Sequence, residues 1–242
     1  MDIDRSVCVV IPARYASTRF PGKPLAMIKD RPLIQHVYDR CRKAENVDKL
    51  VVATDDQRIY DTVIGFGGDV VMTSVDHPSG TDRIAQAVSG IDCDFVINVQ
   101  GDEPLIEPEL IDLIIDSMIC DNSVVVSTPI ALIKDGSDFD NPNVVKVVRD
   151  LDGNALYFSR YAIPFVRDGK TTKCYKHIGL YGYKKDFLLK LIKYPQSELE
   201  KAECLEQLRI LENGFKIKTV VTDYEGVGVD RPEDLEEVER RL

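Results

Sequence analysis

The sequence predicts an α/β fold built on a mainly parallel sheet. Short apolar, β-branched runs alternate with segments whose apolar residues follow helical spacing, and glycines, prolines and polar residues separate the two. Strands that alternate with helices in this way are joined by right-handed crossovers, which make neighbouring strands parallel. The carboxyl ends of such strands form the edge of the sheet at which a ligand binds.

The first hundred residues supply the clearest part of this pattern. Apolar runs predict strands over residues 6–11, 50–53, 69–72 and 95–99. Helices are expected from Pro32 onward, over 55–66 and over about 82–88. This half of the chain therefore reads as successive strand–helix units.

The second half of the chain is less regular. A strand over 124–129 precedes residues 134–143, whose Asp, Asn, Gly and Pro content is typical of a loop. The runs 144–148 and 155–159 flank a turn that contains Gly153 and predict an antiparallel hairpin.

The remaining elements follow in chain order. A strand is expected over 179–183, helices over 185–192 and 198–211, a strand over 216–221 and a charged terminal helix opened by Pro232. At 242 residues, we expect a single domain over 1–242 with an insertion at about 134–175 that carries the hairpin.

Composition excludes several classes of partner. The chain has 31 Lys plus Arg against 41 Asp plus Glu, a formal net charge of −10, which disfavours binding to nucleic acid or to an anionic membrane. The six cysteines are scattered without C-x-x-C pairs, which argues against a zinc site and a disulfide framework. With no signal-like or membrane-spanning run at the start, we expect a cytoplasmic protein without stable membrane insertion.

A basic loop after the first strand is the best candidate for a phosphate site. Arg14, Arg19 and Lys23 bring positive charge to the end of the strand, and Gly22 lets backbone N–H groups approach an anion closely. The loop is not a Walker A motif, because Lys23 is followed by Pro24. A solvated basic loop is the alternative for these residues taken alone.

Two acidic segments are candidates for a metal site. Asp102 and Glu103 follow the apolar strand at 95–99, and Asp230 follows a run containing Gly226 and Gly228. Magnesium needs few protein carboxylates when substrate phosphates supply its other ligands. Taken alone, Asp102 could equally open a helix at the surface, and Asp230 is better explained as the N-cap of the last helix.

Further polar residues lie between these segments. His177 and Tyr181 fall on one face of a strand with period two, where a ligand could meet them. Glu206 and Gln207 lie on a predicted amphipathic helix and could form only its solvated face. A structural role for His177 also remains open.

Taken together in chain order, nine segments resemble the cytidylyltransferases that activate 3-deoxy-D-manno-octulosonate (Kdo), the sugar acid of lipopolysaccharide. The segments are IPARY (11–15), PGKPL (21–25), VATD (52–55), SGTDR (79–83), NVQGDEP (98–104), ALYFSR (155–160), YKHIG (175–179), LEQLR (205–209) and VDRPED (229–234). They span nearly the whole chain, and the ordered set is far more specific than any one segment.

The resemblance implies an architecture and a reaction. The fold would be the Rossmann-like, three-layer fold of the nucleotide-diphosphosugar transferases, with a small antiparallel hairpin insertion in a mainly parallel sheet. The reaction would be CTP plus Kdo giving CMP-Kdo and pyrophosphate. The protein would be a homodimer, for which the apolar hairpin between residues 144 and 158 offers a partner surface.

The resemblance also implies roles for individual residues. Arg14, Lys23, Asp102 and Asp230 would be catalytic, the first two holding the triphosphate and the two aspartates binding Mg²⁺. CTP would contact Ala13, Arg14, Lys23, Thr54, Asp55, Ser79, Gly80, Arg83 and Gln100. The sugar acid would contact Gln100, Arg160, His177, Tyr181, Glu206 and Gln207.

Two departures from the family pattern leave alternatives on the sugar side. Asp82 stands where the family has Glu, and the segment over 167–173 is short. The sugar could therefore be 8-amino-Kdo or another acidic 2-keto sugar such as a sialic acid. A nucleotide-binding module without catalysis is the alternative from another class, and the presence of Lys23, Asp102 and Asp230 together argues against it.

Overall fold

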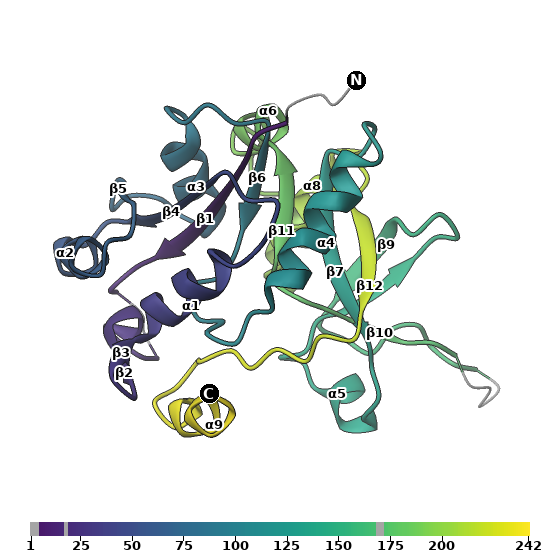
Figure 1. The fold of residues 1–242 in the computed structure, drawn as a ribbon. Helices are drawn as coiled ribbons and strands as arrows, with labels where there is room; N and C mark the ends of the chain where they lie inside the picture. Colours follow the sequence, from purple (N-terminus) through teal and green to yellow (C-terminus); the bar gives the residue numbers. More distant parts are fainter. Residues whose placement is uncertain (1–4, 17–18, 168–171) are drawn as a thin grey trace.

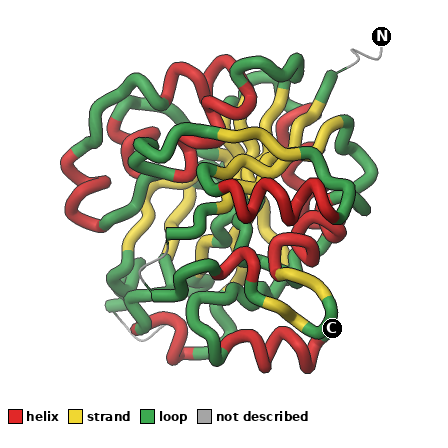
Figure 2. Tube along the Cα trace, turned by 90° about the vertical axis from the view of Figure 1, so that its left-hand side faces the viewer, coloured by secondary structure: helices red, strands yellow, loops and turns green. Residues whose placement is uncertain are grey.

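A ten-stranded sheet runs through the middle of the molecule, with helices on both of its faces (Figures 1 and 2). The computed structural model describes residues 5–16, 19–167 and 172–242. The strand order is β5-β4-β1-β6-β11-β7-β10-β8-β9, and β12 pairs with β7 beside this path. This arrangement confirms the predicted three-layer α/β fold.

The four strands expected from the first part of the chain form one parallel block. They are β1 (Val7–Ala13), β4 (Lys49–Thr54), β5 (Val70–Met72) and β6 (Phe95–Asn98). The crossovers contain α1 (Leu33–Cys41), α2 (Gln57–Gly65) and α3 (Gly80–Val88). Helix α3 begins two residues before the predicted start, because the Ser79 side chain caps it by accepting from the amide of Asp82.

The other half of the sheet mixes directions. β11 (Tyr181–Lys184) runs antiparallel between β6 and β7 (Val126–Leu132), and β12 (Lys218–Thr222) runs parallel to β7. The predicted hairpin consists of β8 (Lys146–Arg149) and β9 (Ala155–Ser159), which reach β7 through β10 (Tyr175–His177). From these pairings, β7, β8 and β12 point the same way as the parallel block, so most strands share one direction.

Alternation along β1 explains the layers. Val9 and Ile11 pack into one apolar core with α1, while Cys8 and Val10 pack into a second core with α3. Helix α4 (Pro108–Ile119) adds to the first core, and α6 (Lys185–Leu191) and α8 (Leu208–Glu212) add to the second. Helices α1 and α4 lie in front of the sheet in Figure 1.

Two α-helices of the described ranges were not predicted. Helix α4 has buried apolar residues with helical spacing, namely Leu110, Ile111, Ile114, Ile115 and Met118, so its signal was present in the sequence. The short α5 (Gly136–Asp140) interrupts the predicted loop over 134–143, and the Asp135 side chain caps it by accepting from the amide of Ser137.

The single strand predicted over 179–183 is wrong at its start. His177 ends β10 and Tyr181 begins β11, and residues 178–180 between them belong to neither strand. Thr128 of β7 holds this break, because its Oγ1 donates to the carbonyl of Leu180 at 2.7 Å. His177 and Tyr181 therefore belong to different strands, although their rings remain 5.2 Å apart between centroids.

The helix predicted over 198–211 is also wrong. It divides into α7 (Glu198–Glu203) and α8, with Cys204 in the left-handed conformation at φ 53°. Arg160 stabilises this turn, since its Nε donates to the carbonyl of Glu203 at 2.9 Å and its Nη2 to that of Cys204 at 3.4 Å. Residues 206 and 207 consequently lie in a turn rather than on a helix face.

The segment that follows β1 meets the C-terminal helix below the sheet in Figure 1. The short 3₁₀ helix η1 (Lys23–Leu25) leads to the small sheet of β2 (Met27–Ile28) and β3 (Arg31–Pro32). The terminal helix α9 (Asp234–Arg241) packs beside β2, where the amide of Lys29 donates to Glu239 Oε1 at 3.1 Å. In the described ranges, none of the helices has the length and apolar character that crossing a membrane requires.

Candidate active site

A cavity of about 430 Å³ opens where β1 and β6 end. Its walls come from the loop after β1, the start of α3, the segment after β6 and the segment before α9. They comprise Pro12, Ala13, Arg14, Ala16, Arg19, Lys23, Pro24, Gly80, Arg83, Gln100, Gly101, Asp102 and Asp230. The predicted basic loop and both predicted metal carboxylates therefore face one cavity at the carboxyl edge of the sheet.

The shape of the basic loop depends on Gly22. This residue adopts φ +74°, and its amide donates to the carbonyl of Tyr15 at 2.9 Å. A Cβ atom at this position would lie 3.0 Å from the Tyr15 ring, so the close turn requires glycine. The turn places Lys23 at the first residue of η1 with its side chain directed at the cavity.

Lys23 is the electrostatic centre of the cavity. Its Nζ lies 2.6 Å from Asp102 Oδ2 and 3.9 Å from Asp230 Oδ1, and it donates to the carbonyl of Val229 at 2.7 Å. The Lys23 side chain is 15% exposed, whereas those of Asp102 and Asp230 are 32% and 54% exposed. One ammonium thus bridges the two carboxylates from the more buried side.

Asp230 does not cap the last helix. Helix α9 starts at Asp234, whose Oδ2 accepts from the amides of Asp230 and Arg231 at 2.7 and 2.8 Å. The Asp230 carboxylate instead accepts from Arg19 Nη1 at 3.0 Å. The N-cap interpretation of Asp230 is therefore wrong, and its carboxylate lies at the cavity.

The segment after β6 holds Asp102 in place. The amide of Val229 donates to the carbonyl of Asp102 at 2.9 Å, which joins this segment to the C-terminal one. Glu103 turns away from the cavity lining and accepts from Tyr224 Oη at 3.0 Å, and burial raises the pKa of its carboxyl. Of the two adjacent acids, Asp102 is the one that a ligand in the cavity can meet.

Gly101 lines the cavity but was not among the predicted site residues. A Cβ atom there would lie 2.8 Å from the carbonyl oxygen of Pro12, so a larger residue would push β1 and this segment apart. Its position between Gln100 and Asp102 was the available signal.

Thr54, Asp55 and Ser79, which were expected around CTP, do not line the cavity. Asp55 acts through Arg83, which lines the cavity and is almost fully buried, since Arg83 Nη2 pairs with Asp55 Oδ2 at 2.5 Å. Thr54 is fully buried at the end of β4, where its carbonyl accepts from the amide of Thr73. Ser79 precedes Gly80, which does line the cavity. Ala13, Arg14, Lys23, Gly80, Arg83 and Gln100 are the expected CTP residues that contact the cavity directly.

Gln100 connects the cavity to the residues expected around the sugar acid. Its Nε2 donates to the carbonyl of Gly179 at 3.2 Å, between β10 and β11. His177 and Tyr181 flank that glycine, with their rings in contact. The hydroxyl of Tyr181 is buried, and the described residues offer it no hydrogen-bond partner.

His177 is neutral in this environment. Burial lowers the pKa of its imidazole to about 3. Its Nε2 lies 2.9 Å from Thr128 Oγ1, whose single proton is directed at the carbonyl of Leu180. Nε2 of the neutral ring is therefore the donor to Thr128, and Nδ1 is left as a hydrogen-bond acceptor.

Arg160, Glu206 and Gln207, the other residues expected around the sugar acid, differ in how many of their polar groups are already hydrogen-bonded. The guanidinium of Arg160 donates to the carbonyls of Pro142, Glu203 and Cys204, which leaves two of its five N–H groups. Glu206 accepts hydrogen bonds from Ser79 and Thr81. The side chain of Gln207 is mostly buried in the same turn as Glu206.

The chemistry of the cavity suits a magnesium–polyphosphate complex. Arg14, Arg19 and Lys23 supply positive charge for phosphate oxygens, and Asp102 and Asp230 supply hard carboxylate oxygens. Two partly exposed carboxylates with open coordination positions fit a cation that takes most of its ligands from water and phosphate.

Comparisons with known proteins point to one family. The family model described as cytidylyltransferase matches residues 8–217. The 3-deoxy-manno-octulosonate cytidylyltransferases of Geobacter metallireducens and Thermodesulfovibrio yellowstonii are 51% and 52% identical, each over 98% of this chain and over 97% and 98% of their own lengths. The solved structure of a CMP:2-keto-3-deoxy-manno-octonic acid synthetase complexed with CTP superposes with a TM-score of 0.94 at 41% identity, covering 98% of both chains.

Proposed function

The chain belongs to the cytidylyltransferase family, and we propose that it activates Kdo by transferring the cytidylyl group of CTP, giving CMP-Kdo and pyrophosphate for lipopolysaccharide synthesis. The observation that carries the proposal is the cavity in which Arg14, Lys23, Asp102 and Asp230 meet. Relatives that cover nearly the whole chain carry the Kdo activity in their names, so 8-amino-Kdo and sialic acid are less favoured as substrates.

The reaction is an in-line displacement at the α-phosphorus of CTP. The anomeric oxygen of the sugar acid attacks, forms the new P–O bond and loses its proton, while the bond to pyrophosphate breaks. Such reactions depend mainly on positioning and charge neutralisation. Arg14 and Lys23 hold the triphosphate, and Lys23 lies deep enough to retain a strong interaction.

Magnesium is the metal that the donor set supports. Asp102 and Asp230 would hold it, and the bound ion would offset the negative charge of the triphosphate and the leaving pyrophosphate. Lys23 contributes from the protein side, because its ammonium lies between both carboxylates and can exchange them for phosphate oxygens.

The nucleotide and the sugar acid occupy neighbouring parts of the site. CTP lies along Ala13, Gly80 and Arg83. Asp55 holds Arg83 in place through an ion pair. Thr54 is buried at the end of β4, behind these residues. Ser79 and Gln100 stand between the two substrates.

The sugar acid lies beyond Gln100, next to polar groups that can form hydrogen bonds with its hydroxyl groups. The buried, unpartnered hydroxyl of Tyr181 and the free Nδ1 of His177 supply one donor and one acceptor. Arg160 contributes its remaining N–H groups to the sugar carboxylate, and Glu206 and Gln207 contribute from the neighbouring turn.

The hairpin insertion is the surface through which two copies form a dimer. Leu151, Leu156, Tyr161 and Phe165 are 107%, 60%, 81% and 88% exposed along this part of the chain. Large apolar side chains exposed to this extent favour burial against a partner. The protein acts in the cytoplasm, which its six unpaired cysteines suit, since thiols stay reduced there.

A substrate panel tests the proposed function. Pyrophosphate release is followed with a coupled assay for CTP, ATP, GTP and UTP, each with Kdo, 8-amino-Kdo and a sialic acid. The highest kcat/KM is expected for CTP with Kdo. Faster turnover with another sugar acid would overturn the choice of Kdo, and absence of pyrophosphate release in every combination would overturn the enzymatic proposal.

A further inference from the structure

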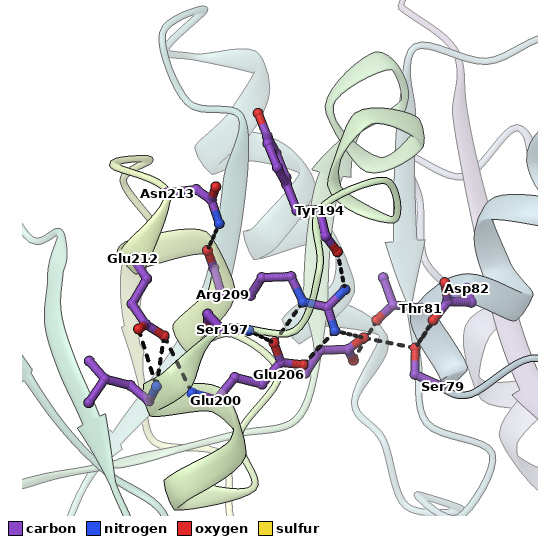
Figure 3. A network of polar contacts seen from close by, with 11 residues as sticks. Ser79, Thr81, Asp82, Tyr194, Ser197, Glu200, Glu206, Arg209, Glu212 and Asn213 are labelled. Atoms are coloured by element: carbon purple, nitrogen blue, oxygen red, sulfur yellow. Dashed lines mark hydrogen bonds and ion pairs between the residues drawn. The ribbon is translucent and has the colours of Figure 1, made fainter.

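The carboxylate of Glu206 is held by hydroxyl groups from the start of α3. Ser79 Oγ lies 2.8 Å from Glu206 Oε1, and Thr81 Oγ1 donates to Glu206 Oε2 at 2.8 Å. Figure 3 shows this carboxylate between the two hydroxyl groups and Arg209. Glu206 therefore links the turn before α8 to the segment that carries Gly80 of the cavity wall.

Arg209 forms a longer ion pair with the same carboxylate oxygen that Ser79 approaches. Its Nη2 lies 3.9 Å from Glu206 Oε1, and its amide donates to the carbonyl of Glu206 at 3.1 Å. The guanidinium is only 7% exposed and forms a two-pronged ion pair with Glu200, with Nε donating to Oε2 at 2.7 Å. Glu200 is itself fixed, because its carboxylate accepts from the amide of Ser197 in a capping box.

This network leaves Glu206 able to accept further hydrogen bonds. Each carboxylate oxygen has about two lone-pair positions, and Thr81 Oγ1 uses one of those on Oε2. Ser79 Oγ uses at most one on Oε1, because its single proton is shared between Glu206 Oε1 and Asp82 Oδ2 at 2.6 Å. The side chain of Glu206 is still 36% exposed. A carboxylate with one open acceptor position on each oxygen matches two neighbouring hydroxyl groups of a polyhydroxylated ligand.

We propose that Thr81 and Arg209 are positioning residues that orient the Glu206 carboxylate for paired hydroxyl groups of the sugar acid. The inference rests on the proposed function for the identity of that sugar acid. Neither Thr81 nor Arg209 lines the nucleotide cavity, so both act through Glu206. Their effect falls on the sugar substrate rather than on CTP.

Thr81→Val provides the sharpest test, because valine keeps the shape of the buried threonine and removes only the hydroxyl group. The KM for Kdo should rise roughly tenfold, the loss expected for one hydrogen bond to a charged acceptor. The KM for CTP should stay within about twofold of the wild-type value, since the cavity lining is unchanged. Thr81→Ser keeps the donor and should restore the wild-type KM for Kdo.

A second variant keeps the test decisive if Thr81→Val fails to fold. Arg209→Lys retains the charge opposite Glu200 but loses the fork of the guanidinium, and it should also raise the KM for Kdo selectively. An unchanged KM for Kdo, or equal increases for Kdo and CTP, in a folded variant would overturn the inference. Wild-type enzyme that does not use Kdo and CTP would instead overturn the proposed function.

Discussion

The ammonium of Lys23 lies 2.6 Å from the carboxylate of Asp102. Because Lys23 also bonds to the Val229 carbonyl and approaches Asp230, it occupies the space between the two carboxylates that are proposed to bind magnesium. A triphosphate entering the cavity offers Lys23 an alternative anionic partner. Its binding would release Asp102 to the metal and so couple the binding of nucleotide and metal.

Removing the Lys23 charge should strengthen metal binding in the absence of nucleotide. Lys23→Met removes the cation that bridges the two carboxylates and, among the described residues, leaves only Asp230 paired, with Arg19. We expect Mg²⁺ to bind roughly tenfold more tightly by isothermal titration calorimetry. CTP binding should weaken in the same variant, because the triphosphate loses a cation. Lys43→Met, at an exposed lysine outside the cavity, is the matched control. Unchanged Mg²⁺ affinity in folded Lys23→Met would exclude the competition.

The two cavity aspartates should be needed for turnover but not for folding. Asp102→Asn and Asp230→Asn preserve side-chain shape at partly exposed positions, and each should lower kcat by roughly 10²- to 10³-fold. The Tm of thermal unfolding should remain within a few degrees of the wild-type value. Asp116→Asn, at an exposed residue of α4, should leave kcat unchanged. Near-normal kcat in both cavity variants would refute the metal assignment.

His177 should make the protein less stable as the pH falls. Its pKa is about 3 in the folded state against an ordinary value of 6.5, so the unfolded chain binds a proton that the folded chain does not. The resulting loss of unfolding free energy is absent above about pH 6.5 and grows by at most about 1.4 kcal/mol per pH unit below it.

Urea unfolding at pH 7.5 and pH 5.0 measures this contribution. His177→Gln keeps an amide donor for Thr128 but cannot titrate, so its unfolding free energy should change less between the two pH values than that of the wild type. The same pH dependence in both proteins would contradict the buried, neutral state of His177.

The exposed hairpin should control oligomeric state. Leu156→Lys places a charge in the proposed contact surface. Sedimentation velocity should then show a monomer for the variant and a dimer for the wild type. Leu199→Lys, at an exposed leucine of α7 outside the hairpin, should leave the dimer intact. A wild-type protein that sediments as a monomer would refute the proposal directly.

The sequence was most informative where local pattern and fold agree. The strands of the parallel block are apolar runs that end at polar residues, so they were predictable. The hairpin was predictable because Gly153, at φ +81°, marks its turn. The basic loop and Asp102 could be placed at one edge because the carboxyl ends of parallel strands meet there.

The predicted elements were wrong where contacts with residues distant in the sequence determine the backbone conformation. Cys204 takes a left-handed conformation that no local signal indicates, and Arg160, far away in the chain, binds the carbonyls around it. Similarly, Thr128 on a neighbouring strand holds the break between His177 and Tyr181. The roles of Thr81 and Arg209 could not be predicted either. They depend on the position of Glu206 in the turn between α7 and α8, and the sequence predicted a continuous helix there.

Isotope tracing tests the central claim most directly. The wild-type enzyme is given CTP, Mg²⁺ and Kdo labelled with ¹⁸O at the anomeric hydroxyl, and the products are analysed by mass spectrometry. If the anomeric oxygen attacks the α-phosphorus, the label will be found in the CMP-Kdo and the pyrophosphate will be unlabelled. Labelled pyrophosphate, or pyrophosphate formed without CMP-Kdo, would contradict the proposed reaction.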